Sequence, residues 1–187
     1  MTKFILGKKL GMTTIFSETN EALNVTLVEC AAKVSALRTE EKDGHVAVQI
    51  EMPKTKKRIV KKEFRVASTE AKVGDEISVD IFEIGDEVHV TGIAKAKGFQ
   101  GVVKRHSFSG GYASHGNKHA LRAPGAIGSG YPEHVIKGKR MAGRMGGKRV
   151  TSKNVKIVFI NKEQNLMALK GAVPGIPGAV VEIYTTN

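Results

Sequence analysis

The residues best suited to chemistry in this sequence are cations gathered in one stretch. Residues 93–153 contain 13 Lys and Arg, four of the six His, and a single acid, Glu133. The other 126 residues contain 17 bases and 17 acids, so the formal excess of +12 belongs to one stretch of the 187-residue chain. Ammonium and guanidinium groups bind phosphate oxygens, and so concentrated an excess of them predicts a polyanionic partner.

Glycine accompanies the cations, most densely in the run KGKRMAGRMGGKR at 137–149. Residues 93–153 hold 12 of the 21 glycines, and glycine lets a backbone approach another surface closely and expose its N–H donors. Only 12 of these 61 residues are Leu, Ile, Val, Met or Phe, against 43 of 126 elsewhere. Such a segment buries too little apolar surface to hold one shape without a partner.

Nucleotide-binding motifs are absent from this glycine-rich stretch. The nearest P-loop candidate has Ala142 at its first position and Arg149 at its last, where Gly and Ser or Thr are required. The dinucleotide pattern begins correctly at Gly128 and Gly130, but Glu133 replaces its third glycine. We therefore expect no cofactor and no small-molecule substrate.

His115 and His119 have the four-residue spacing that a helix uses to place two imidazoles on one metal. The nearby glycines disfavour a helix, and no Cys, Asp or Glu lies close enough in sequence to complete a ligand set. Contact with phosphates or bases is the preferred interpretation, and no metal is expected. No nucleophile–base motif is visible, so we expect no catalytic residue, and Cys30 lies in an apolar pattern typical of a buried thiol.

The polyanion is predicted to be RNA. A membrane surface would call for an amphipathic helix or a lipidation motif, and neither is found. DNA-binding motifs are also missing, and a glycine-rich strand that folds around its ligand suits structured RNA. A solvated basic loop without a partner is the plainer alternative, which the charge density disfavours. A lone cysteine and the lack of a secretory signal or an 18-residue apolar stretch favour the cytoplasm.

The remaining residues, 1–92 and 154–187, read as a neutral body rich in β-strands. Alternating apolar residues predict strands at 22–30 and 45–52, and a hairpin from 155–160 and 166–170. The repeat VGDEI at 73–77 and IGDEV at 84–88 predicts two consecutive strands, 179–185 predicts another, and 31–39 is a weaker helix candidate. This pattern predicts a mainly β fold, a barrel or sandwich, interrupted by a basic, glycine-rich, irregular extension at 93–153.

Basic residues also occur in the body, and their interpretation stays open. The run KTKKRIVKK at 54–62 has six bases and no acid, and it fits a solvated face or a second RNA contact equally well. Lys8 and Lys9 carry the same ambiguity on composition alone.

The order of several motifs resembles one family along essentially the whole chain. These motifs are ILGKKLGMTTIF at 5–16, KGFQGVVKRHSF at 97–108, ASHG at 113–116, RAPGAIG at 122–128, KGKRMAGRMGG at 137–147 and LKGAVPG at 169–175. The chain thereby resembles the bacterial type of the universal large-subunit ribosomal protein L-three family. The resemblance implies a β-barrel body, and an extension that passes between helices of the large-subunit (23S) rRNA towards the peptidyl transferase centre. It also implies early binding in subunit assembly, and neighbouring large-subunit ribosomal proteins as partners.

Candidate rRNA-binding residues follow from the charge map and from the motifs. The resemblance implies rRNA contacts from the extension residues that match the family's motifs. It also favours rRNA contacts from the two N-terminal lysines, which lie in a matching motif. The remaining candidates are basic residues of the same stretch. The full set is Lys8, Lys9, Lys95, Lys97, Lys104, Arg105, His106, His115, Lys118, His119, Arg122, Lys137, Lys139, Arg140, Arg144, Lys148, Arg149 and Lys153.

The chain departs from the family pattern at a few positions. The family prefers Asp or Asn where His89 stands, Ser or Thr at Ala94, and Gly at Ala96, all near the start of the extension. Some members carry a methylated glutamine where this chain has Arg144, and the segment SGYPEHVI at 129–136 is divergent. The alternative from another class is a stand-alone RNA chaperone or RNA-modifying enzyme built on the same body. An enzyme would place acids or a cofactor pocket near the extension, which supplies only Glu133.

Overall fold

The computed structural model describes residues 3–16, 20–55, 57–66 and 71–185. The chain divides into two compact units, residues 1–94 with 149–187, and residues 95–148. We call the first unit the body and the second the extension. The sequence predicts an extension at 93–153, whereas Ile93 ends one strand of the body and residues 149–153 begin another.

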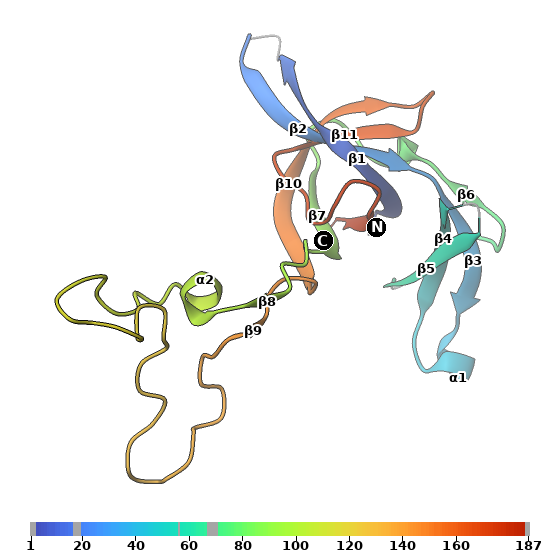
Figure 1. Cartoon of the computed structure of the whole chain (residues 1–187). Helices are drawn as coiled ribbons and strands as arrows, with labels where there is room; N and C mark the ends of the chain where they lie inside the picture. Colours follow the sequence, from blue (N-terminus) through green and yellow to red (C-terminus); the bar gives the residue numbers. More distant parts are fainter. Residues whose placement is uncertain (1–2, 17–19, 56, 67–70, 186–187) are drawn as a thin grey trace. The chain divides into compact units, whose positions relative to one another are not determined.

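Six antiparallel strands of the body form a closed ring. Neighbouring strands pair in the order β1-β12-β7-β10-β11-β2, and β2 pairs back to β1. Figure 1 shows β1 and β2 reaching beyond the other strands of the ring as a long hairpin. The mainly β fold predicted from the sequence is confirmed. The ring strands are β1 (Phe4–Phe16), β2 (Ala22–Cys30), β7 (Glu87–Ile93), β10 (Arg149–Asn161), β11 (Leu166–Lys170) and β12 (Val180–Tyr184).

A second, four-stranded sheet completes the body, in the order β5-β4-β3-β6. The short helix α1 (Glu40–Asp43) joins β3 to β4 and ends at Gly44, whose φ of 71° suits a residue without a side chain. A 3₁₀ turn, η1 (Val79–Ile81), follows β6. The strands are β3 (Ala32–Arg38), β4 (Ala47–Thr55), β5 (Arg58–Arg65) and β6 (Glu76–Ile77).

The helix suggested for residues 31–39 is wrong, because this segment forms β3. Ala32 and Val34 are buried while Lys33 between them is exposed, the two-residue period of a strand with one covered face. Pairing with β4 along most of its length supplies the hydrogen bonds that a helix would have made internally. Tertiary pairing therefore overrides the local helix preference of this alanine-containing segment.

The repeated VGDEI and IGDEV segments lead into strands of two different sheets. Gly74 and Gly85 both adopt positive φ, 101° and 97°, at the turns that the Gly-Asp pairs predict. The first repeat continues into β6 beside β3, and the second continues into β7 of the ring. The two strands are consecutive along the chain, as expected, but they do not pair with each other.

The ring and the second sheet share one hydrophobic core. Ile5, Leu169 and Ile183 of the ring belong to the same fully buried cluster as Val48 and Ile50 of β4. Cys30 lies in this cluster, and burial, with a smaller contribution from the charge of Glu29, raises the pKa of its thiol to about 12. The predicted buried thiol is confirmed, and at neutral pH it stays protonated.

The extension has little regular structure (Figure 1). Two-residue strands β8 (Phe99–Gln100) and β9 (Gly143–Arg144) pair with each other, and a single short helix, α2 (Val102–His106), follows β8. All residues of the extension are described, and Val102 is its one buried apolar side chain. Across the described residues of both units, no helix is long and apolar enough to cross a membrane.

Candidate nucleic-acid interface

The two arms of the extension are joined where it begins and ends. Lys97 N–H donates to the Met145 carbonyl and Met145 N–H donates to the Gly98 carbonyl, each at 2.9 Å. Gly146 adopts a φ of 72°, and a Cβ added there would lie 2.1 Å from the Lys95 carbonyl oxygen. Only glycine fits this close approach, so the glycine-rich composition here serves contact within the extension.

Helix α2 presents three of the predicted contact residues, in part to the extension itself. Arg105 Nη1 donates to the Met141 carbonyl at 2.6 Å, and His106 Nε2 lies 3.1 Å from the same oxygen. Lys104 is exposed, and its side chain donates no hydrogen bond to a described residue. Arg105 and His106 therefore hold the two arms together, and their remaining donors are the ones left for a ligand.

A loop between residues 108 and 125 carries four more candidates. Gly111 N–H donates to the Leu121 carbonyl at 3.1 Å, and Asn117 Nδ2 donates to the Tyr112 carbonyl at 2.7 Å. These bonds close the loop with its cationic and imidazole side chains exposed, and no three or more His, Cys, Asp or Glu of the described chain could hold a metal ion. The exposed candidates are His115, Lys118, His119 and Arg122.

The cations of the extension have no anionic partners in the described chain. Eleven Lys and Arg lie in residues 95–148 with one acid, Glu133, and no ion pair between described residues involves any of them. All but the half-buried Arg105 are exposed. A row of uncompensated cations on open backbone is suited to phosphate groups, which would supply the missing negative charge. Besides those already placed, the exposed candidates are Lys95, Lys97, Lys137, Lys139, Arg140, Arg144 and Lys148.

Exposed aromatic rings accompany these cations, a feature not predicted from the sequence. Phe99, Tyr112 and Tyr131 are 77%, 81% and 89% exposed. Aromatic faces stack on unpaired bases, and this contribution does not depend on charge. The low aromatic content of the whole chain hid them; the signal was an aromatic residue next to glycine or alanine inside the basic stretch.

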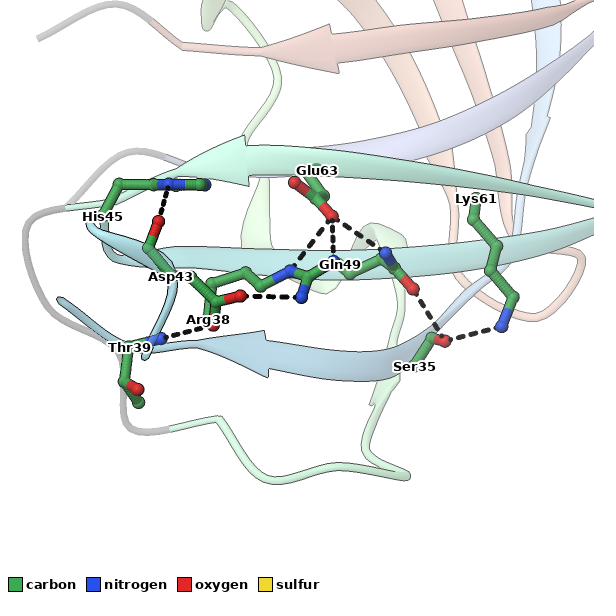
Figure 2. A network of polar contacts seen from close by, with 8 residues as sticks. All are labelled: Ser35, Arg38, Thr39, Asp43, His45, Gln49, Lys61 and Glu63. Carbon is green, nitrogen blue, oxygen red and sulfur yellow. Dashed lines mark hydrogen bonds and ion pairs between the residues drawn. The ribbon is translucent and has the colours of Figure 1, made fainter. Parts of the chain in front are cut away.

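Arg38, on one face of the second sheet, shows the opposite arrangement (Figure 2). Arg38 on β3 donates to Asp43 at 2.8 Å and to Glu63 of β5 at 3.2 Å, and Glu63 also accepts from Gln49 at 2.9 Å. The Gln49 and Arg38 hydrogen bonds lower the pKa of Glu63, while Glu63 and the charge of Asp43 raise the pKa of Arg38. This face neutralises its own charges and has little to offer a polyanion.

Lys9 is a correction to the predicted contact set. Its side chain belongs to the body interior, with only 6% of the residue exposed, and its Nζ donates to the Val173 carbonyl at 2.7 Å and to the Gly175 carbonyl at 3.2 Å. The ammonium group thus satisfies buried carbonyls, which a surface phosphate cannot reach. Lys8, its neighbour on the opposite face of β1, is half-buried.

Arg149 and Lys153 also lie in the body, on ring strand β10. Arg149 Nη2 donates to Glu182 Oε2 at 2.5 Å, and this hydrogen bond and the carboxylate charge raise the pKa of Arg149. Lys153 is exposed. The structure therefore separates these two residues from the eleven cations of the extension, and it places Arg149 beside an acid.

Comparison with known proteins identifies the family. The family described as ribosomal protein L3 matches residues 16–173. "Large ribosomal subunit protein uL3" of Chloroherpeton thalassium is 42% identical, covering 98% of this chain and 99% of its own length. The proteins of the same name from Herpetosiphon aurantiacus and Corynebacterium jeikeium are 43% and 45% identical, covering 98% of this chain and 96% and 94% of theirs. Because the family model covers most of the chain and these relatives align with 98% of it, the chain belongs to the ribosomal protein L3 family, which is a structural component of the ribosome and not an enzyme.

Proposed function

We propose that this protein is a structural constituent of the large ribosomal subunit that binds 23S rRNA through its extension. The observation that carries the proposal is the charge state of residues 95–148, eleven cations with one acid and no ion pair in the described chain. Phosphates of converging rRNA helices would supply the missing counter-charge, and Phe99, Tyr112 and Tyr131 would supply faces for unpaired bases.

In this proposal the body and the extension have different roles in the large subunit. The six-stranded ring acts as a small β-barrel that docks on the rRNA surface and beside neighbouring ribosomal proteins in the cytoplasmic ribosome. The extension reaches between rRNA helices and supports the region near the peptidyl transferase centre, where the RNA performs the chemistry. Since the extension has a single buried apolar residue, it takes its final shape with RNA, which favours binding early in subunit assembly.

The salt dependence of binding to the isolated rRNA domain tests this proposal. If about eight extension cations meet phosphates, the log–log plot of affinity against salt should have a slope of about −6 to −7. The relevant side chains are exposed and unpaired among the described residues, so counterion release should dominate. Affinity measured by filter binding across a salt series gives the slope, and a value near zero would exclude the phosphate-contact mechanism.

A further inference from the structure

Two neighbouring lysines of the basic run at 54–62 lie on opposite faces of the second sheet, because successive residues of a strand point to opposite sides. In the antiparallel register of β4 and β5, Ile50 is opposite Lys62, while Glu51 is opposite Lys61. Ile50 is fully buried in the shared core, so Lys62 lies on the face of the sheet directed towards the ring. Lys61 lies on the opposite face, where its Nζ donates to Ser35 (Figure 2). The same Nζ pairs with Glu51 at 3.3 Å. Adjacent lysines therefore face different surroundings.

Lys62 lines a cleft of about 190 Å³ within the body, between the second sheet and the ring. Lys54 of β4 and Arg149 of β10 line the same cleft, so three cations from three strands converge there. Ring residues Gly92, Ile93 and Val180 line the cleft opposite β4 and β5.

One acid faces these cations. The Glu182 side chain, only 12% exposed, pairs with Lys62 Nζ at 3.1 Å and with Arg149 Nη2 at 2.5 Å. A nearly buried carboxylate needs such partners, and in return it fixes where both cations sit. Three cations and one carboxylate leave a formal charge of +2 in the cleft. Arg149 has five N–H donors and Lys62 has three, so donors remain for a second anion.

We propose that this cleft is a second phosphate-binding site, on the body, that takes the sugar-phosphate backbone of RNA. The proposal rests on the proposed rRNA binding and names the residues through which the body would contact a phosphate. The phosphate would be bound at the mouth of the cleft by Lys54, Lys62 and Arg149, with Glu182 holding the last two in place. RNA is the favoured ligand because exposed Lys57 and Arg58 continue the positive charge along the β4–β5 hairpin, as a polymer with repeated phosphates requires.

The first test compares adjacent lysines in the full-length protein. The double variant Lys54→Ala/Lys62→Ala should reduce the steepness of the salt slope by about 1.5 and weaken binding to the isolated rRNA domain about tenfold. Lys61→Ala removes one charge from β5 on the other face, and it should leave the slope unchanged. Melting curves show whether each variant is folded. Equal slopes for the two variants would show that the cleft does not bind a phosphate. A slope near zero for the unchanged protein would instead contradict the rRNA-binding proposal.

A second test needs no substitution. The protein is treated with an amine-acetylating reagent, alone and in complex with the rRNA domain, and each lysine is followed by mass spectrometry. Bound RNA should lower acetylation of Lys54 and Lys62 several-fold and leave Lys61 and Lys156 unchanged. If Lys54 and Lys62 react equally in the free protein and in the complex, the cleft does not bind RNA.

Discussion

Arg38 of the body and Arg140 of the extension carry the same guanidinium group in opposite circumstances. Arg38 pairs with Asp43 and Glu63 on its own sheet, whereas no acid of the described chain pairs with Arg140. All eight ion pairs between described residues lie in the body. Ion pairing within the described chain is thus confined to the body, while the cations of the extension have no acidic partner there. Net charge acquires functional meaning only after pairing is known.

Apolar residues show the same contrast between the two units. Ile183 is fully buried in the core of the body, whereas Ile136 in the extension is 65% exposed. The body therefore has the hydrophobic stabilisation of a folded domain, whereas the extension has one buried apolar side chain and a few hydrogen bonds. The predictions below test whether the two units are as independent as this contrast implies.

Removal of the extension should have the largest effect. Ile93 and Arg149 are paired partners in the ring, so replacing residues 94–148 with Asn-Gly should close β7 and β10 with a two-residue turn. We expect a folded body by circular dichroism, with rRNA affinity lowered at least about a thousandfold, since about eight lost contacts of about 0.5 kcal/mol each amount to about 4 kcal/mol. An unfolded product would show that the extension belongs to the folding unit of the body.

A matched pair of isoleucines should show that the hydrophobic core lies in the body and not in the extension. Ile183→Ala leaves a cavity in the core and should lower the free energy of unfolding by about 2–5 kcal/mol. Ile136→Ala removes an exposed side chain and should change it by less than about 0.5 kcal/mol. Urea denaturation of both variants measures the difference. Comparable losses would mean that the extension contributes to the core.

Two glycines of the extension should respond differently to the same substitution. Gly146 and Gly138 both have positive φ, 72° and 82°, but only at Gly146 would a Cβ meet another atom, the Lys95 carbonyl oxygen. Gly146→Ala should therefore disturb the junction of the two arms and weaken rRNA binding about tenfold more than Gly138→Ala, a difference of about 1.4 kcal/mol. Neither should shift the melting temperature of the body. Equal affinities would show that the junction does not set the shape of the bound extension.

The smallest effects should come from single arginines. Arg140→Ala should reduce the steepness of the salt slope by about 0.8, one phosphate contact, without changing the melting temperature. Arg38→Ala should lower the melting temperature of the body slightly and leave the salt slope unaltered, because its charge is already paired on an exposed surface. Filter binding and thermal melts of both variants measure these effects. A salt slope that changes more for Arg38→Ala than for Arg140→Ala would contradict the prediction.

Much of the strand pattern was predictable from alternating residues alone. The strand at 22–30 and the hairpin of 155–160 with 166–170 are confirmed as β2, β10 and β11, because period-two alternation is a local property. The helix predicted at 31–39 is wrong because this segment pairs with β4, and its own residues do not show that partner. The separation of the VGDEI and IGDEV repeats into two sheets also depended on pairing that no local motif encodes.

The candidate site divides along the same line. Sequence alone located the block of excess charge, since covalent composition does not depend on folding. It did not reveal that Lys9 binds buried carbonyls, that Arg149 is held by Glu182, or that Lys61 and Lys62 face opposite sides of a sheet. The first two depend on contacts between residues far apart in the chain, and the third depends on which face of β5 packs on the core.

The sequence by itself determined the family, the mainly β composition of the body and the place of the uncompensated charge. Only the tertiary structure decided which cations are neutralised within the protein and which remain for a ligand. The physical reason is that the Coulomb energy of a side chain depends on the distance to its partner, and strand pairing sets that distance. Adjacent lysines can thus lie on opposite faces of one sheet, Lys61 paired with Glu51 and Lys62 paired with Glu182 in a cleft that keeps a net positive charge.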